Sequence, residues 1–147
     1  MIKFVIEGAP YGKGRPRFTR SGHTYTPGKT AQYERIVQYA YKSQALGRRL
    51  NGPIEATIYA QFGPIKSDSK KTWAAKLAGL FLPTKKPDCD NIAKTVLDAL
   101  NGVAYDDDCQ VIALHVYKLY GDTPQVFVSL REVENADDLM PIPAYSS

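Results

Sequence analysis

The sequence predicts an α+β fold, a single domain in which helices pack against a mixed β-sheet of about four strands. Three observations lead to this prediction. Stretches in which apolar and polar residues alternate occur near the start, the middle and the end of the chain, as expected of half-buried strands. Between them, apolar residues recur at three- and four-residue steps, as on amphipathic helices. The length of 147 residues suits one domain with an adequate core, and the sequence contains no internal repeat.

The first two elements are a strand and a basic loop. Residues 2–7 alternate, which predicts a strand. Residues 8–22 are punctuated by glycine and proline, which predicts a loop. Lysine and arginine on a loop suit contacts with phosphates, and aromatic residues between them suit stacking on exposed bases. The basic residues of this loop are Lys13, Arg15, Arg17 and Arg20.

A helix, a strand and a short helix follow. Thr26-Pro27 is a typical helix start, apolar residues keep helical spacing as far as Tyr41, and Gly47 is the expected stop. Residues 53–62 alternate and predict a half-buried strand. Residues 67–79 predict a short helix, whose lysines either contact DNA or are simply solvated.

The C-terminal part predicts two strands, residues 111–120 and 125–133, which the turn at residues 121–124 joins into a hairpin. The segment after them has weak structural signals, so we expect a flexible tail over residues 134–147. The predicted domain therefore spans residues 1–133.

Acidic residues dominate the stretch between the short helix and these strands. Asp88 and Asp90 stand two apart after a proline and project to one side if the backbone is extended there. A helix then opens at Asp90 or Asn91, and Asn101-Gly102 ends it through a left-handed cap. Three aspartates, residues 106–108, follow at the mouth of the next strand. The polar face of the helix carries Asn91, Lys94, Asp98 and Asn101.

Gathered carboxylates suit a hard divalent cation. Like charges at short range raise one another's pKa, and a bound cation removes that cost. Mg²⁺ takes one or two carboxylates together with waters and phosphate oxygens, and it can supply a metal-bound hydroxide for phosphodiester hydrolysis. Lys94, one turn beyond Asp90, is placed to contact the same phosphate. The alternative is structural, a capped helix followed by an acidic turn.

Other kinds of site are disfavoured. Cys89 and Cys109, taken with the two histidines, lack a recognised zinc-ligand spacing, so we expect two reduced cysteines that serve as small core residues. The aspartates at 88 and 90 lack the central glycine and final glutamate of an EF-hand. The glycines before Lys13 depart from P-loop spacing, so we expect no nucleotide cofactor.

Charge is distributed unevenly along the chain. Residues 1–49 contain ten Lys and Arg residues but two acidic residues. Residues 50–147 contain nine Lys and Arg residues and thirteen acidic residues. This asymmetry suits a protein that grips a polyanion with one part and binds cations with another, although a solvated basic surface is the alternative. The sequence has neither an apolar run near 18 residues nor a signal peptide at its start, so we expect a cytoplasmic protein without a membrane partner.

Three motifs carry a resemblance to a known family. The motif Lys-Pro-Asp-Cys-Asp-Asn-x-x-Lys begins at residue 86, Asp-Ala-Leu-Asn-Gly begins at residue 98, and Asp-Asp-x-Gln-Val begins at residue 107. Together with the opening strand and its basic loop, they resemble the RusA family of Holliday junction resolvases in its phage-type form. The similarity covers most of residues 1–133, and the phage-type form suggests a phage or prophage origin.

The resemblance implies a homodimeric, Mg²⁺-dependent endonuclease, with Mn²⁺ as a substitute, that cuts four-way DNA junctions symmetrically in recombination and repair. The metal-binding acids of the family fall on Asp88, Asp90 and Asp108, and its catalytic lysine falls on Lys94. Because three aspartates stand at the turn, the choice between Asp107 and Asp108 is open, and the spacing to Gln110 favours Asp108. The expected DNA-binding residues are Lys13, Arg15, Arg17, Arg20, Lys85 and Lys86.

Two other functions remain as alternatives. One is a module that binds branched DNA without cutting it, although the intact acids and Lys94 argue against this reading. The other is a metal-dependent nuclease that acts on other DNA structures, such as flaps or single strands, because the acidic residues predict hydrolysis and not branch geometry.

Overall fold

The computed structural model describes residues 1–13, 17–18, 24–25 and 28–139. Within these residues a four-stranded sheet forms the centre of the fold, in the order β1-β6-β4-β5. β4 is parallel to β5 and antiparallel to β6, and β6 is antiparallel to β1, so the sheet is mixed. The predicted α+β fold is confirmed. The strands are β1 (Ile2–Glu7), β4 (Ile54–Phe62), β5 (Val111–Tyr120) and β6 (Gln125–Glu132).

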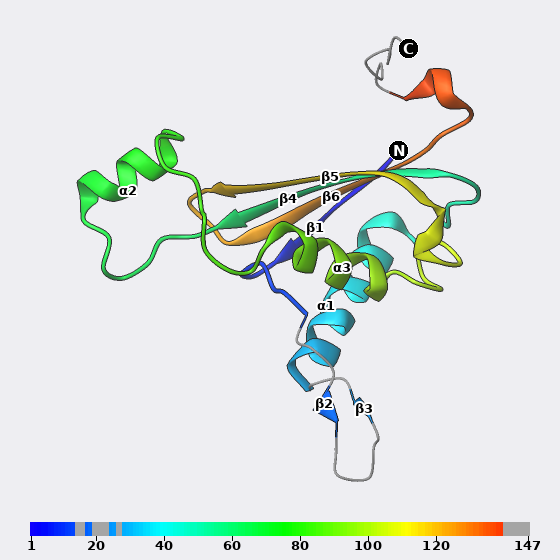
Figure 1. Cartoon of the computed structure of the whole chain (residues 1–147), viewed down its shortest axis with the longest axis horizontal. Helices are drawn as coiled ribbons and strands as arrows, with labels where there is room; N and C mark the ends of the chain where they lie inside the picture. Colours follow the sequence, from blue (N-terminus) through cyan, green and yellow to red (C-terminus); the bar gives the residue numbers. More distant parts are fainter. Residues whose placement is uncertain (14–16, 19–23, 26–27, 140–147) are drawn as a thin grey trace.

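Helices α1 (Gly28–Ala45) and α3 (Cys89–Ala99) lie on one face of the sheet, and no helix in the described part of the chain covers the other face (Figure 1). Alternate residues of β4 are buried, because one side of the strand faces this helical layer. Tyr33 and Tyr41 of α1 are buried in the core, whereas Ile36 and Tyr39 of the same helix are exposed. The predicted helix start at Thr26-Pro27 lies outside the described residues. Burial of these apolar faces stabilises both helices in place.

The predicted hairpin between the last two strands is wrong. Both strands exist, but β4 lies between them. The connection, residues 121–124, passes over the end of β4, where the Gly121 N–H donates to the carbonyl of Phe62 over 3.0 Å. A Cβ at Gly63 would lie 2.8 Å from Cδ of Pro124 and 3.2 Å from its backbone nitrogen, so glycine at position 63 permits this close crossing. Alternation predicts that a strand exists but not which strand is its neighbour, and the crossing leaves β5 at an edge of the sheet.

Smaller elements complete the described part. β2 (Arg17–Phe18) lies inside the segment 8–22 that was expected to be a loop, and it pairs with β3 (Thr24–Tyr25), just after that segment, as a small second sheet. Two 3₁₀ turns, η1 (Asp108–Gln110) and η2 (Ala136–Asp138), precede β5 and follow β6. The expected tail begins with η2, which an ion pair of 2.9 Å from Arg131 to Asp138 holds, and residues 140–147 lie outside the described residues.

Helix α2 (Lys70–Leu77) stands apart from both layers, beyond the end of β4 (Figure 1). None of the described helices is both long enough and apolar enough to cross a lipid bilayer.

Candidate active site along helix α3

Asp88 fixes the start of helix α3. Its carboxylate accepts a hydrogen bond of 2.9 Å from the backbone N–H of Asn91, which is the geometry of an N-cap. The N-cap is therefore Asp88, two residues before Asp90 and three before Asn91, the two expected caps. Asp90 lies within the helix, so Asp88 and Asp90 do not project together from an extended segment. The helix ends at Ala99, and its C-cap Leu100 is right-handed, so the expected left-handed cap at Asn101-Gly102 is wrong. Gly102, with a φ of 74°, belongs to the turn that follows.

The outer face of α3 carries the polar residues that the sequence assigned to it. Asp90, Lys94 and Asn101 are exposed and Asp98 is half-buried, while the opposite side of the helix packs into the core. The apolar residues of that buried side are Ile92, Ala93, Val96, Leu97 and Ala99. Because the helix is strongly amphipathic, its core contacts hold the polar face outward in a fixed orientation.

Asp108 lies at the other end of α3. The Asp108 N–H donates to Oδ1 of Asn101 over 2.8 Å, which ties the turn to the end of the helix. Asp107 has a different role, because its carboxylate accepts the Cys109 N–H over 3.1 Å and caps η1. The Gln110 side chain in turn accepts the N–H groups of Asp106 and Asp107, at 2.9 and 3.1 Å. This arrangement leaves the Asp108 carboxyl directed toward Asp98.

Asp98 and Asp108 form a carboxyl pair. Burial, the hydrogen-bonded contact with Asp98, and the charges of Asp98 and Asp107 together raise the pKa of Asp108 above its ordinary value. The chemistry of this donor pair suits a hard cation, which would relieve the repulsion. Sequence reasoning did not name Asp98 as a site residue. Its position one helical turn beyond Lys94, on the same polar face of the helix, could have indicated that Asp98 belongs to the site.

Lys13 lies beside this pair. Its ammonium donates to Oδ2 of Asp98 over 2.9 Å and lies 3.8 Å from Oε1 of Glu34. The hydrogen bond to Asp98 and the two negative charges raise the pKa of Lys13, and burial opposes them. Lys13 therefore has an internal partner in addition to its expected contact with DNA. Arg15, Arg20 and the side chain of Arg17 in β2 lie outside the described residues.

A cavity of about 520 Å³ opens beside Asp88, at the N-terminal end of α3. Gly12 allows the chain to pass close to the helix here, because a Cβ at this position would lie 2.7 Å from Cβ of Pro87. Lys85 and Lys86 are both exposed near this end. Lys86 lines the cavity, whereas the Lys85 ammonium lies 5.5 Å from the ring centroid of Phe62.

The expected metal ligands form two groups and not one. Asp88 and Asp90 lie at the N-terminal end of α3, and Asp108 lies with Asp98 at its C-terminal end. Eight residues separate Asp90 from Asp98, or about 12 Å along a helix. Throughout the described residues, no three His, Cys, Asp or Glu side chains lie close enough together to hold one metal ion. Each end of α3 nevertheless offers two carboxylates, the number that Mg²⁺ commonly takes.

The sequence predicted that the two cysteines serve as small core residues, and this prediction is wrong. Cys89 and Cys109 are both exposed and reduced. Cys89 occupies the first position of α3 and Cys109 lies within η1, so each belongs to a turn at the surface and not to a buried strand.

The fold is a mixed sheet with one helical layer, and its site consists of acids and a lysine along a helix beside a basic segment. This combination defines a protein suited to phosphodiester chemistry on nucleic acid.

The sequence comparisons agree with this class. The model of the endodeoxyribonuclease RusA family matches residues 7–131, and the chain belongs to this family. It is a nuclease family that acts on Holliday junctions. The chain is also 38% identical over 137 residues to the uncharacterized protein YqaN of Bacillus subtilis (strain 168), an alignment that covers 90% of this chain and 96% of YqaN.

Proposed function

We propose that this protein is a Mg²⁺-dependent endodeoxyribonuclease that resolves four-way DNA junctions by paired symmetric cuts in recombination and repair. Mn²⁺ is the expected substitute for Mg²⁺. The observation that carries the proposal is the exposed face of α3, on which Lys94 lies between Asp90 and Asp98, with further aspartates at both helix ends. Because a four-way junction has two-fold symmetry, the active form is proposed to be a homodimer with two sites.

Each end of this face offers two carboxylates that fit a hard divalent cation, so the proposal places one cation-binding pair at each end of α3. Asp88, Asp90 and Asp108 are the proposed metal-binding residues, and the contact between Asp98 and Asp108 adds Asp98 to them. When bound, the ion would supply an activated water and neutralise charge on the phosphate.

The basic side chains have complementary roles in the proposal. Lys94 is exposed between the two acidic ends and would stabilise the scissile phosphate. Lys86, on the rim of the cavity beside Asp88, and Lys85 would hold the adjoining backbone. Lys13 would keep Asp98 charged and oriented through its 2.9 Å bond, and Arg15, Arg17 and Arg20 would extend the grip on DNA.

The test uses the purified protein with an end-labelled four-way junction and a linear duplex of matched sequence, with Mg²⁺ or with a chelator. Symmetric cuts confined to the junction, and present only with the metal, are the expected result. Tight junction binding without cuts would identify a binding module. Equal cutting of both DNAs would retain the hydrolytic site and reject junction selectivity.

Asp90→Asn provides the matched test of the site. The substitution removes one carboxylate from an exposed position, so we expect loss of cleavage with retention of junction binding. Cleavage at the wild-type rate would show that Asp90 does not bind the metal. Asp122→Asn, in the exposed connection between β5 and β6, is the control and should cut normally.

A further inference from the structure

Residues 63–82, here called the α2 arm, project from the body of the protein beyond the ends of β4 and β5 (Figure 1). Helix α2 begins at the Ser69 cap, whose hydroxyl accepts the Thr72 N–H over 3.1 Å, and it ends before Gly79, where φ is 78°. The arm is therefore locally well formed. However, none of the residues of α2 is buried against the described residues of the chain.

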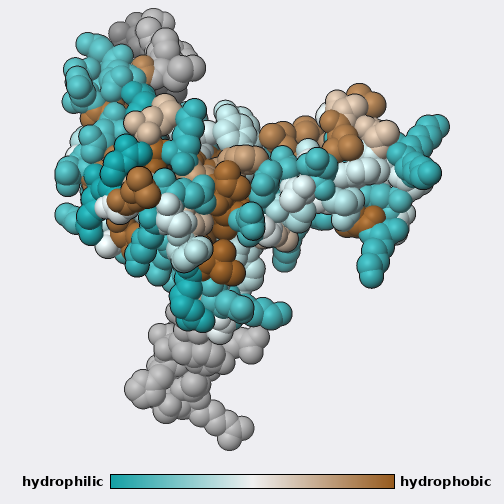
Figure 2. Space-filling view, turned by 180° about the vertical axis from the view of Figure 1, so that it is seen from behind, coloured by the Kyte–Doolittle hydropathy of each residue, from teal (hydrophilic) through white to brown (hydrophobic). Residues whose placement is uncertain are grey.

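The α2 arm exposes an unusual amount of apolar surface. Figure 2 shows these side chains gathered on the arm at the right of the view. A helix of eight residues is too short to be stable alone in water, and several large apolar side chains exposed on one short segment indicate an interaction site. The exposed apolar residues of the arm are Ile65, Leu77, Leu80, Phe81 and Leu82.

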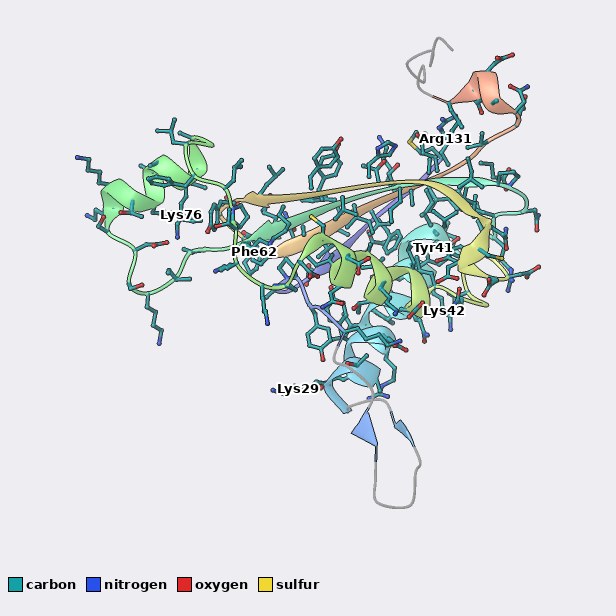
Figure 3. The ribbon with its side chains drawn as sticks, viewed as in Figure 1. Lys29, Tyr41, Lys42, Phe62, Lys76 and Arg131 are labelled. Atoms are coloured by element: carbon teal, nitrogen blue, oxygen red, sulfur yellow. The ribbon has the colours of Figure 1, made fainter. Side chains whose placement is uncertain are left out.

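The base of the arm is held in position by charge. The Lys76 ammonium forms an ion pair of 2.9 Å with Asp68 and lies 4.7 Å from the ring centroid of Tyr120 in β5. Figure 3 shows Lys76 and Phe62 at this junction between the arm and the sheet. Because these contacts fix its direction, the arm presents its apolar side chains outward and does not fold back over the sheet.

Strand β5 offers a second uncovered apolar surface on the same chain. It pairs with β4 on one side, and its outer edge has no partner strand among the described residues. Edge strands are commonly protected by prolines, bulges or charges. Lys118 is the one Lys, Arg, Asp or Glu among its ten residues, and a single register shift lies at its start. The exposed apolar residues of β5 flank its edge on both faces of the sheet: Leu114 pairs with buried Ala56 on the helix side, and Tyr117 pairs with exposed Tyr59 on the open side. Ile112 and Leu119 are the other two.

Charge favours a second copy of this chain as the partner of both surfaces. The arm carries four lysines against Asp68, and it lies at the end of the sheet where β5 finishes. At the opposite end of the sheet η1 precedes β5 and η2 follows β6 (Figure 1). Acidic residues outnumber basic ones there, although Arg49 pairs with Asp106 and Arg131 pairs with Asp138. An antiparallel two-fold arrangement along β5 would place each basic arm beside the acidic end of its partner. The acidic residues of that end are Asp106, Asp107, Glu132, Glu134 and Asp137.

We propose that the α2 arm of each protomer docks on strand β5 of a second copy, so that two identical contacts form the dimer. This deepens the proposed function, because it rests on the homodimer proposed there and assigns its surface. DNA could attract the lysines of the arm, but it would leave the five apolar side chains exposed to water. Reciprocal docking covers the arm and the edge strand together.

The experiment measures the molar mass of the full chain by light scattering over a dilution series, without DNA or metal. The wild type should be a dimer. Phe81→Asp in the arm and Leu114→Asp in β5 should each raise the dissociation constant of the dimer by about a hundredfold or more, because each places a charge in the apolar contact twice. Leu46→Asp is the control, since Leu46 is 84% exposed outside both surfaces and aspartate tolerates its positive φ. Circular dichroism should show that all variants are folded.

Three results would overturn the inference. A monomeric wild type would exclude the dimer, and a Phe81→Asp variant as dimeric as the wild type would exclude the arm. Dissociation by Phe81→Asp but not by Leu114→Asp would place the arm on a surface other than β5. Cleavage is measured separately, so a dimer that does not cut DNA rejects the proposed function and not this inference. A Phe81→Asp variant that stays dimeric and loses junction binding would instead identify the arm as a DNA contact.

Discussion

At the scale of the residue, Asp108 combines a proposed function with a cost in stability. Its carboxyl contacts that of Asp98, and burial and repulsion raise its pKa, so the charged side chain destabilises the metal-free protein. We therefore expect Asp108→Asn to raise the melting temperature by a few degrees in chelator while it abolishes cleavage. Mg²⁺ should raise the melting temperature of the wild type, because the ion binds the folded state, and should have less effect on the variant.

Asp107→Asn is the matched control for this prediction. Asp107 caps η1 through the Cys109 N–H, and asparagine can accept the same bond. This variant should melt and cut like the wild type. A lower melting temperature for Asp108→Asn in chelator would contradict the assigned repulsion. The sequence predicted the acids and Lys94 by their spacing, but it did not predict that Asp98 meets Asp108, because that contact depends on how η1 folds back on the helix.

At the scale of the element, Asp88 at the start of α3 has two roles that can be tested separately: it caps the helix, and it is proposed to bind the metal. Asp88→Ala removes the N-cap, and we expect a loss of about 1 kcal/mol in the free energy of unfolding, measured in urea. Asp88→Asn keeps the cap and should have nearly wild-type stability. Both variants remove the carboxylate, so both should lose cleavage if Asp88 binds the metal. Full activity of Asp88→Asn would leave Asp88 a purely structural residue.

The elements themselves were largely predictable, since hydrophobic period and caps are local signals. β1 has the predicted bounds, and α1, β4 and α3 differ from theirs by a few residues. The neighbour of β5 was not predictable from the short segment 121–124, which is typical of a hairpin. The crossing over β4 depends on Gly63, where close approach to Pro124 and not turn geometry requires glycine.

At the scale of the whole molecule, the uneven charge predicts a strong dependence of junction binding on salt. Each phosphate contact releases counterions, so the logarithm of the binding constant should fall linearly with the logarithm of salt concentration. Lys86 is exposed on the cavity beside Asp88. We expect Lys86→Ala to reduce the magnitude of that slope by about 0.9 for one lost contact. Lys3→Ala is the control, because Lys3 is exposed in β1 and alternates with the buried residues that face the helices. Binding titrations at several salt concentrations in chelator measure both slopes. Equal slopes for Lys86→Ala and the wild type would place the DNA away from the N-terminal end of α3.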